Sequence, residues 1–341
     1  MKYRLLILLL SLISLHNTAF SFNVNLDSIA TKGKFMKFYV DTYRFTDKFF
    51  NEIDTAYVSP TGYKWNVKLR AISWTDFNGF YFDNSHQLGM ASPFCSSIGA
   101  DVQFMAIALG YDINMNKLFG GKDRSKSRFN FEFSSARFSG RFYSLKNNDG
   151  MDLKSINKKP IEKILFPGIT SSTWGIDLTY YFNYKRYSNQ AAFSFGKIQK
   201  RSQGSFITGL IFQSQKLFFD MNKLPGDIKE WLPENWQNRD FKSDGKNIGI
   251  SGGYGQNWVP HKNITLGFMG LVIPSLHYGY LNSIEKGYSF RLNYRFSASA
   301  VWNHNRWFVG AVAKADAGFI YSESTLTNGQ LSLEAKFGWR F

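Results

Sequence analysis

Four histidines follow residue 21 of this chain, and one of them, His86, has an acidic neighbour at Asp83. A histidine and an aspartate within hydrogen-bond reach could serve as the base and the acid of a hydrolytic reaction. His277 is expected at the same end of the molecule, whereas His261 and His304 fall in predicted turns at the opposite end. Because this spacing alone does not define a catalytic site, no catalytic residue is assigned and hydrolysis is kept as the alternative function.

A larger set of charged residues occupies alternate positions within apolar segments. Alternate side chains of a strand point to opposite faces, so these charges are expected to share the face opposite the apolar one. The basic members are Lys64, Lys68, Arg70, Arg137, Arg141, Lys185, Arg291, Arg295, Lys314, Lys336 and Arg340. The acidic members are Glu132, Asp177, Asp316 and Glu334. Since four carboxylates cannot pair with eleven cations, this face is predicted to be basic, with charge left over for water or an anionic ligand.

The apolar residues between these charges predict β-strands. The clearest is segment 331–341, where apolar residues that end in Phe337, Trp339 and Phe341 alternate with polar ones. A strict period of two indicates a strand with one apolar face and one polar face. Aromatic residues make up 18% of the chain, yet its mean hydropathy is negative. A transmembrane β-barrel reconciles the two observations, because its strands turn apolar side chains to lipid and polar side chains to the lumen.

The first 21 residues predict a cleaved signal peptide. They contain Lys2 and Arg4, an apolar run over residues 5–15, and the small-residue pattern Ala19-Phe20-Ser21. The apolar run is about half the roughly 20 residues that a spanning helix needs. Export places the barrel in the outer membrane of a Gram-negative envelope. There the net charge of +16 would meet outer-membrane lipid and anionic glycolipid, and nucleic acid is excluded as a partner.

Residues 22–62 lack the alternation of the strands. Apolar residues recur at threes and fours between Phe35 and Ile53, which predicts one amphipathic helix of about five turns. The expected domains are the signal peptide (1–21), a periplasmic segment with this helix (22–62) and the barrel (63–341). The helix is expected beneath the barrel mouth, with the inner-membrane surface and the lumen as the alternative placements.

Counting strands backward from Phe341 predicts an all-β, antiparallel up-and-down barrel of about ten strands. Such barrels have short periplasmic turns, longer outer loops and both termini in the periplasm. This count takes 94–113 as one strand, 128–146 as one strand with a β-bulge near 134–136, and 190–215 as one long strand after a tight turn. Twelve strands are the alternative, through a hairpin at 200–204 and a split of 94–113. A soluble β-sandwich shares the alternation and is the competing architecture.

Three stretches resemble an uncharacterised family of Bacteroidota outer-membrane barrels, known only as a domain of unknown function. They are Asp54–Val58, Tyr187–Phe193 and Gln199–Phe206, and the resemblance covers about residues 50–341. It implies an outer-membrane barrel and carries over no functional residue.

The sequence therefore predicts a structural or permeability role, with a basic lumen that favours anions or binds anionic glycolipid. The alternative is a membrane-embedded hydrolase acting on lipid or surface peptide. Phe337, Trp339 and Phe341 are expected to be recognised by the barrel assembly machinery, with the C-terminus in the periplasm. No cofactor and no metal site is predicted. The single cysteine, Cys95, is expected to be a small hydrophobe on a strand rather than a nucleophile.

Overall fold

The computed structural model describes residues 26–83, 85–104, 107–115, 126–237, 240–281, 286–321 and 325–341. The predicted signal peptide lies outside the described residues. The chain divides into two compact units, Met1–Glu52 and Ile53–Phe341. Within the described ranges, no helix combines the length and the apolar character that a membrane crossing needs.

The first unit contains two helices, α2 (Leu26–Ala30) and α3 (Lys34–Asn51). An ion pair joins them, with Arg44 Nη2 lying 2.6 Å from Asp27 Oδ1. The 18 residues of α3 confirm the predicted helix, and Phe35 and Phe45 on its surface are exposed. These apolar residues follow the helical spacing that predicted the element.

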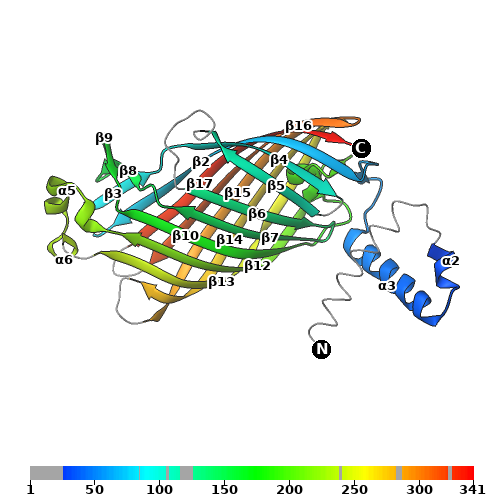
Figure 1. Ribbon diagram of the computed structural model, residues 1–341, viewed down its shortest axis with the longest axis horizontal. Coiled ribbons are helices and arrows are strands. Elements are labelled where there is room, and N and C mark those ends of the chain that lie inside the picture. The colour runs from blue at the N-terminus through cyan, green and yellow to red at the C-terminus, as the bar shows by residue number, and fades with distance from the viewer. Residues whose placement is uncertain are drawn as a thin grey trace. The chain divides into compact units, whose positions relative to one another are not determined.

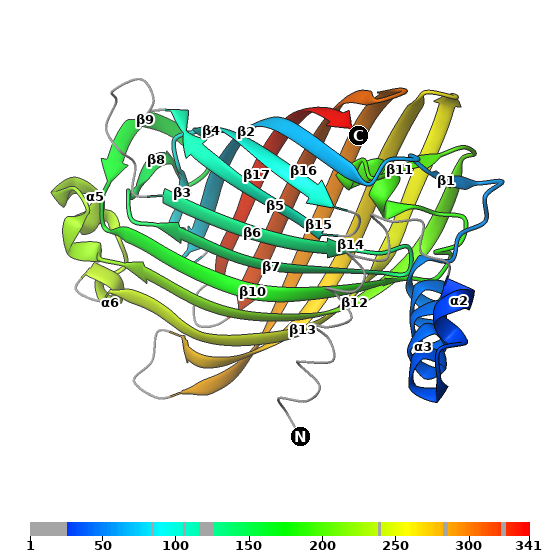
Figure 2. The same cartoon turned by 45° about the vertical axis from the view of Figure 1, so that its right-hand side comes forward.

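The second unit is a large antiparallel sheet that curls until its first and last strands pair (Figure 1). The closing ladder joins β17 to β2 from Thr325↔Tyr81 to Arg340↔Asn66. Figure 2 shows β6, β7, β10, β12 and β13 along the near wall, with β14 to β17 behind them. In ring order, the strands are β2 (Trp65–Tyr81), β4 (Cys95–Phe104), β5 (Ile107–Asn114), β6 (Lys126–Ser134), β7 (Phe138–Asn147), β10 (Ile169–Tyr181), β12 (Gln203–Phe219), β13 (Phe241–His261), β14 (Ile264–Leu281), β15 (Gly287–His304), β16 (Trp307–Tyr321) and β17 (Thr325–Arg340).

The closed ring contains twelve strands among the described residues, so the expected count of ten is wrong. Segment 94–113 holds two strands, β4 and β5, as the twelve-strand alternative anticipated. The other extra strand arises at residues 135–137, where Ser135 N donates to Phe138 O at 2.8 Å in a tight turn. A bulge and a hairpin both shift the alternation, so the pattern at 134–136 did not distinguish them. Closure of the ring also rules out the β-sandwich.

The outer surface of the ring is apolar. Leu178 on β10 is 55% exposed and Leu333 on β17 is 59% exposed, although both would be buried in a soluble protein. Every strand of the ring contributes at least one such side chain. Examples in ring order are Leu69, Ile98, Tyr111, Phe129, Phe142, Leu178, Leu210, Ile250, Val272, Phe296, Val309 and Leu333. The polar side chains on the alternate positions therefore face the interior.

One end of the barrel is occupied by residues 182–202, which we call the plug. It contains the π-helix η1 (Gln190–Ser194) and the short strand β11 (Lys197–Gln199), which pairs with β1 (Val58–Pro60). Four of its apolar side chains are fully buried, namely those of Tyr187, Ala191, Ala192 and Phe195. The expected tight turn followed by a strand from residue 190 is therefore wrong, because β12 begins only at Gln203.

The plug is fastened to the wall of the barrel at several strands. Asn257 Nδ2 on β13 donates to the carbonyl of Ser188 at 2.9 Å, and Arg340 Nη2 on β17 donates to the carbonyl of Phe195 at 3.0 Å. The ring of Phe195 packs on Phe308 of β16, with centroids 5.4 Å apart. These contacts come from separate strands of the ring, so the plug closes this end of the interior.

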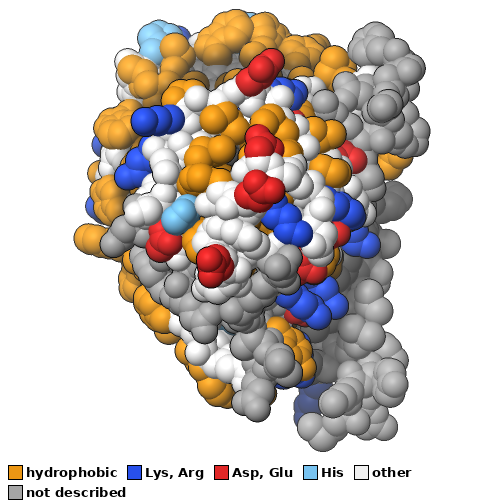
Figure 3. Space-filling view, turned by 90° about the vertical axis from the view of Figure 1, so that its left-hand side faces the viewer, with side chains coloured by type: hydrophobic (Ala, Val, Ile, Leu, Met, Phe, Trp, Pro, Cys, Tyr) orange, Lys and Arg blue, Asp and Glu red, His pale blue; other side chains and the backbone are white. Residues whose placement is uncertain are grey.

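The opposite end is covered by a second structure, which we call the cap. Phe80 on β2 lies 4.9 Å from Phe241 on β13 and 5.8 Å from Phe219 on β12, measured between ring centroids. Because β2 lies across the ring from β12 and β13, these aromatic contacts close the barrel. Figure 3 looks onto this end and shows it covered by side chains of mixed type. The cap comprises β3 (Gln87–Ala91), β8 (Met151–Ile156), β9 (Lys159–Phe166), η2 (Met221–Lys223), α5 (Gly226–Trp231) and α6 (Glu234–Gln237).

Candidate functional site

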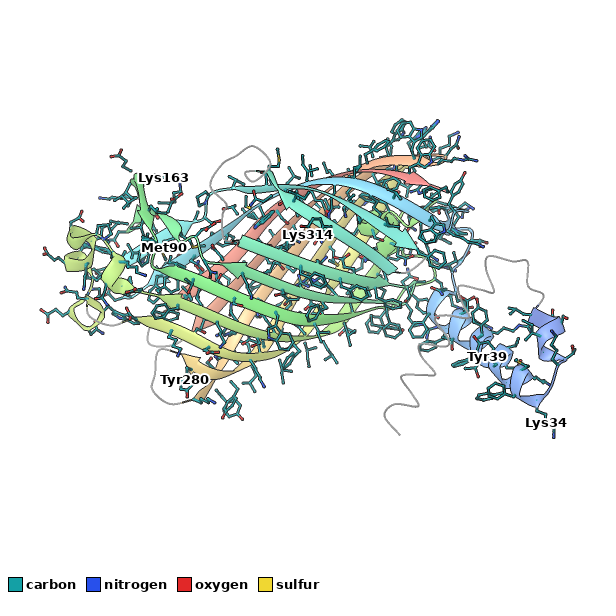
Figure 4. All side chains as sticks on the ribbon, viewed as in Figure 1. Lys34, Tyr39, Met90, Lys163, Tyr280 and Lys314 are labelled. Carbon is teal, nitrogen blue, oxygen red and sulfur yellow. The ribbon has the colours of Figure 1, made fainter. Side chains whose placement is uncertain are left out.

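Between the plug and the cap, the barrel encloses two adjoining cavities. The first has a volume of about 300 Å³ and lies toward the plug, and the second has a volume of about 220 Å³ and lies toward the cap. Figure 4 shows Lys314 within the barrel. We call the two cavities together the chamber, because they share the lining residues Arg128, Asn130, Arg141, Arg295 and Lys314.

An ion-pair network crosses the middle of the chamber. The Asp177 carboxylate on β10 lies 2.5 Å from Arg141 Nη2 on β7 and 3.0 Å from Arg295 Nη1 on β15. Arg295 also donates from Nε to Asp316 Oδ1 at 2.7 Å. Asp177 is only 4% exposed, so its charge depends on these two guanidinium groups. The network therefore ties four strands of the ring, β7, β10, β15 and β16, together through their inward faces.

Further ion pairs line the wall of the first cavity. Arg70 donates to Asp112 from Nε and from Nη2, each at 2.7 Å, which is the two-pronged geometry that holds a guanidinium to a carboxylate. Lys336 Nζ lies 3.0 Å from Glu334 Oε2 on the same strand. Most acidic groups of the chamber are thus already engaged with a base.

Arg128 and Lys314 differ from these paired bases. Among the residues that the structure describes, neither forms an ion pair, and the buried Nη1 of Arg128 has no hydrogen-bond partner. Glu132 and Glu334 balance the charge of Lys314 only through space, while Glu132 itself accepts a hydrogen bond from Asn130 at 2.8 Å. The two cations sit where the cavities meet, so a ligand in either cavity could reach them.

The structure places the residues predicted to line the lumen in three groups. All four predicted acids, Glu132, Asp177, Asp316 and Glu334, line the chamber. So do seven of the predicted bases: Lys68, Arg70, Arg141, Arg291, Arg295, Lys314 and Lys336. Arg137 and Arg340 instead contact the plug, through the hydroxyl of Tyr184 at 2.6 Å and the carbonyl of Phe195 at 3.0 Å. Lys64 and Lys185 are exposed and lie outside the strands, so the prediction that they line the lumen is wrong.

Several charged residues of the chamber were missed from the sequence. Nine basic and seven acidic side chains line it, which is less basic than the predicted eleven to four. Asp101 and Asp112 were missed because segment 94–113 was taken as one strand. Across the turn between β4 and β5 the inward face changes from odd to even positions, so both carboxylates point inward. Arg128 alternates with the inward residues Asn130 and Glu132, and that period could have identified it. The missed residues are Asp76, Asp101, Asp112, Arg128 and Lys146.

The histidines give one close contact with an acid. His86 Nδ1 lies 2.8 Å from Asp83 Oδ2, and Asp83 Oδ1 accepts the backbone N–H groups of Ser85 and His86 at 2.7 Å each. His277 is fully buried and pairs instead with the amide oxygen of Asn247 at 2.7 Å. The Asp83–His86 pair thus lies within the hydrogen-bond distance that acid–base chemistry requires. The same carboxylate also stabilises the local turn by accepting two backbone N–H groups.

This turn is expected to respond to acid. The hydrogen bond from His86, followed by the backbone N–H groups of Ser85 and His86, lowers the pKa of Asp83 below its ordinary range. Because the pKa is lower in the folded state, the contribution of the carboxylate is complete above the unfolded pKa and is lost as the pH falls through the folded one. In an NMR titration, the side-chain carboxyl carbon of Asp83 should show its main transition below the ordinary aspartate range. Asp83→Asn is the control and should remove the transition, whereas a transition within the ordinary range would contradict the expectation.

Two further predicted features can be located. Phe337, Trp339 and Phe341 lie exposed on the outer face at the end of β17, and Phe341 N donates to the carbonyl of Trp65 at 3.1 Å. Cys95 is buried in a small apolar cluster. In the described part of the chain, no three His, Cys, Asp or Glu side chains are grouped so that they could hold a metal ion.

A family model described as Domain of unknown function (DUF4421) matches residues 52–341. No curated protein matches the chain by sequence. Among solved structures, the outer membrane protease OmpT from Escherichia coli is similar with a TM-score of 0.37 and 8% identity, over 82% of this chain and 97% of that chain. The Pseudomonas putida toluene transporter TodX is similar with a TM-score of 0.25 and 8% identity, over 82% of this chain and 90% of that chain. A Pseudomonas aeruginosa FadL homologue is similar with a TM-score of 0.26 and 9% identity, also over 82% of this chain and 90% of that chain. These likenesses concern the fold alone.

Proposed function

This chain belongs to the DUF4421 family of unknown function, and we propose that it is an integral outer-membrane barrel that binds an anionic ligand in its closed chamber. The observation that carries the proposal is the pair of half-buried cations, Arg128 and Lys314, which line the chamber and form no ion pair with a described residue. A buried charge without a partner is costly, and an anion bound between the two would offset that cost.

The membrane location rests on the surface of the barrel. A continuous ring of exposed apolar side chains would be unstable in water, whereas in a bilayer it faces lipid. The predicted signal peptide and the aromatic end of β17 support export and insertion by the barrel assembly machinery. Inserted with its C-terminus in the periplasm, the barrel has the plug at the periplasmic end and the cap at the outer end. Lipid and glycolipid of the outer membrane are then its neighbours.

The choice of an anion rests on the charges around each cavity. The second cavity is lined by six basic residues, Arg128, Arg141, Lys146, Arg291, Arg295 and Lys314. In the described part of the chain, only two acidic residues, Asp76 and Asp316, line it. Arg291 is 3% exposed and is held by neutral partners, donating to Gln215 at 2.6 Å and to Ser243 at 3.0 Å. The excess of basic over acidic residues around this cavity therefore favours phosphate, sulfate or carboxylate groups as ligands.

The test is calorimetric titration of the detergent-solubilised protein with inorganic phosphate. We expect saturable binding that weakens about tenfold or more in Arg128→Gln and in Lys314→Gln, since a charge-assisted hydrogen bond contributes about 1.5–3 kcal/mol. Lys216→Gln is the matched control, because that lysine is 69% exposed on the outer surface and should leave binding unchanged. Equal binding by all four proteins, or none by the wild type, would reject the proposal.

The alternative, a hydrolase acting on lipid or surface peptide, is favoured by the Asp83–His86 contact at the cap. An ester or peptide turnover that is abolished by His86→Ala while phosphate binding persists would support it over the binding role.

A further inference from the structure

The wall of the barrel is incompletely paired between β5 and β6. Their ladder contains Ile107↔Phe133 and Ala108↔Glu132 among the described residues, and both pairs lie at the plug end. Elsewhere these strands are fully paired, β5 with β4 and β6 with β7. Beyond Ala108, toward the cap, the described residues of the two strands form no ladder with each other. We call this unpaired stretch, residues 109–114 of β5 and 126–131 of β6, the seam.

The seam explains why Arg128 has no partner. If the ladder continued in the same register, Asp112 would lie directly opposite Arg128, and the two charges would pair across the strands. Instead, Asp112 turns to Arg70 and accepts two hydrogen bonds from it at 2.7 Å. Arg128 is therefore left on one edge of the seam with a buried Nη1 that no described residue satisfies.

The first cavity reaches through the seam. Its lining includes Asp112 and Arg128 from the inward faces of the two strands, and also Tyr111, Phe129 and Phe133 from their outward faces. Tyr111 is 76% exposed and Phe129 is 52% exposed, so they belong to the outer surface of the barrel. At the seam, no ladder among the described residues separates this cavity from the outer surface. The seam is therefore the place in the described wall where a side route to the surrounding medium could form, while the plug and the cap cover the two axial ends.

The geometry points to lateral entry of a membrane lipid that bears a phosphate in its headgroup. This inference rests on the function proposed above and names the ligand class and its route. The phosphate would lie against Arg128 and Lys314, where a guanidinium can bind two of its oxygens, while the acyl chains stay in the bilayer beside Tyr111 and Phe129. A volume of about 300 Å³ suits a headgroup but not the chains. Because the seam lies on the cap side of the two paired positions, the lipid would come from the outer leaflet.

The experiment asks whether a lipid headgroup can reach the chamber from the membrane. Asn130, which lines both cavities beside the seam, is changed to Cys in a Cys95→Ala background, and the barrel is placed in phosphatidylcholine vesicles. The probe is phosphatidylethanolamine with a maleimide on its headgroup, and N-ethylmaleimide measures the intrinsic reactivity of the thiol. Gln213→Cys is the matched control, since it lines the second cavity from β12, away from the seam.

We expect Asn130→Cys to react with the lipid maleimide at least tenfold faster than Gln213→Cys, after each rate is divided by that with N-ethylmaleimide. Lys314→Gln in the same background should slow the lipid reaction several-fold and leave the N-ethylmaleimide rate unchanged. Labelling of Asn130→Cys by N-ethylmaleimide but not by the lipid, or by neither reagent, would overturn lateral entry. Should Asn130→Cys fail to show heat-modifiable gel migration, Ala108→Cys gives the same test from β5. Calorimetric phosphate binding that persists without lipid labelling would reject the lipid route while retaining the anion site.

Discussion

Replacement of Asp177 by alanine is expected to destabilise the barrel by about 3–5 kcal/mol, the usual cost of removing one partner from a buried ion pair. Its carboxylate lies against Arg141 at 2.5 Å and Arg295 at 3.0 Å, and it is 4% exposed. Without it, Arg141 loses its ion-pair partner, and Arg295 keeps only Asp316. The measurement is the free energy of unfolding by urea in detergent, followed by tryptophan fluorescence.

The matched control is Asp244→Ala, which removes an ion pair with Lys216 at 3.4 Å on the outer part of the barrel. The Lys216 side chain is 69% exposed, so this change should cost less than about 1 kcal/mol. A loss of similar size in both variants would show that the network across the chamber contributes no more than a surface pair. A double variant, Asp177→Ala with Arg141→Met, should recover part of the stability, because one of the uncompensated cations is then removed.

The wild-type barrel is expected to carry no unitary current in a planar bilayer. Phe80 contacts Phe241 and Phe219 across the ring at the cap, and Phe195 is packed on Phe308 at the plug. Because each end is closed independently, replacing plug residues 188–199 with a short glycine–serine linker should also leave the bilayer silent. Conductance is expected only when Phe80, Phe219 and Phe241 are replaced by alanine as well, because these rings close the cap end.

Heat-modifiable gel migration is the control that each variant of this series remains a folded barrel. Stepwise currents from the wild type would contradict the closed chamber and would restore an open, permeable role. Currents from the plug variant alone would instead show that the cap does not seal its end, despite the aromatic contacts across it.

The three stretches that carry the family resemblance meet in one place. Val58, the last residue of the first stretch, begins β1 and pairs with Gln199, the first residue of the third, which ends β11. Asp54 of the first lies 3.3 Å from Arg186, beside the second. Asn257 then joins the Gln199 side chain to the wall at 3.0 Å. The three motifs, which are separate in the sequence, therefore form the plug and its attachment to the barrel. Closure of this end depends on the same residues.

Most of the barrel could be predicted from local alternation. The apolar and polar residues of β15, β16 and β17 alternate with a period of two that can be recognised within each strand. Arg295, Lys314, Asp316 and Glu334 were therefore expected to share a face, and in the structure all four line the chamber. The strand count failed where alternation changes phase near Ser134. A tight turn and a bulge produce the same change, and the choice between them depends on pairing with other strands.

The sequence by itself determined that this chain forms a curled antiparallel sheet with an apolar exterior, because those features depend on the side chains of single strands. Only the tertiary structure decided that the ring has twelve strands, that both ends are closed, and that Asp112 pairs with Arg70 and leaves Arg128 at the seam. The physical reason is distance along the chain. Arg340 reaches Phe195 across 145 positions, and no local periodicity encodes a contact of that kind.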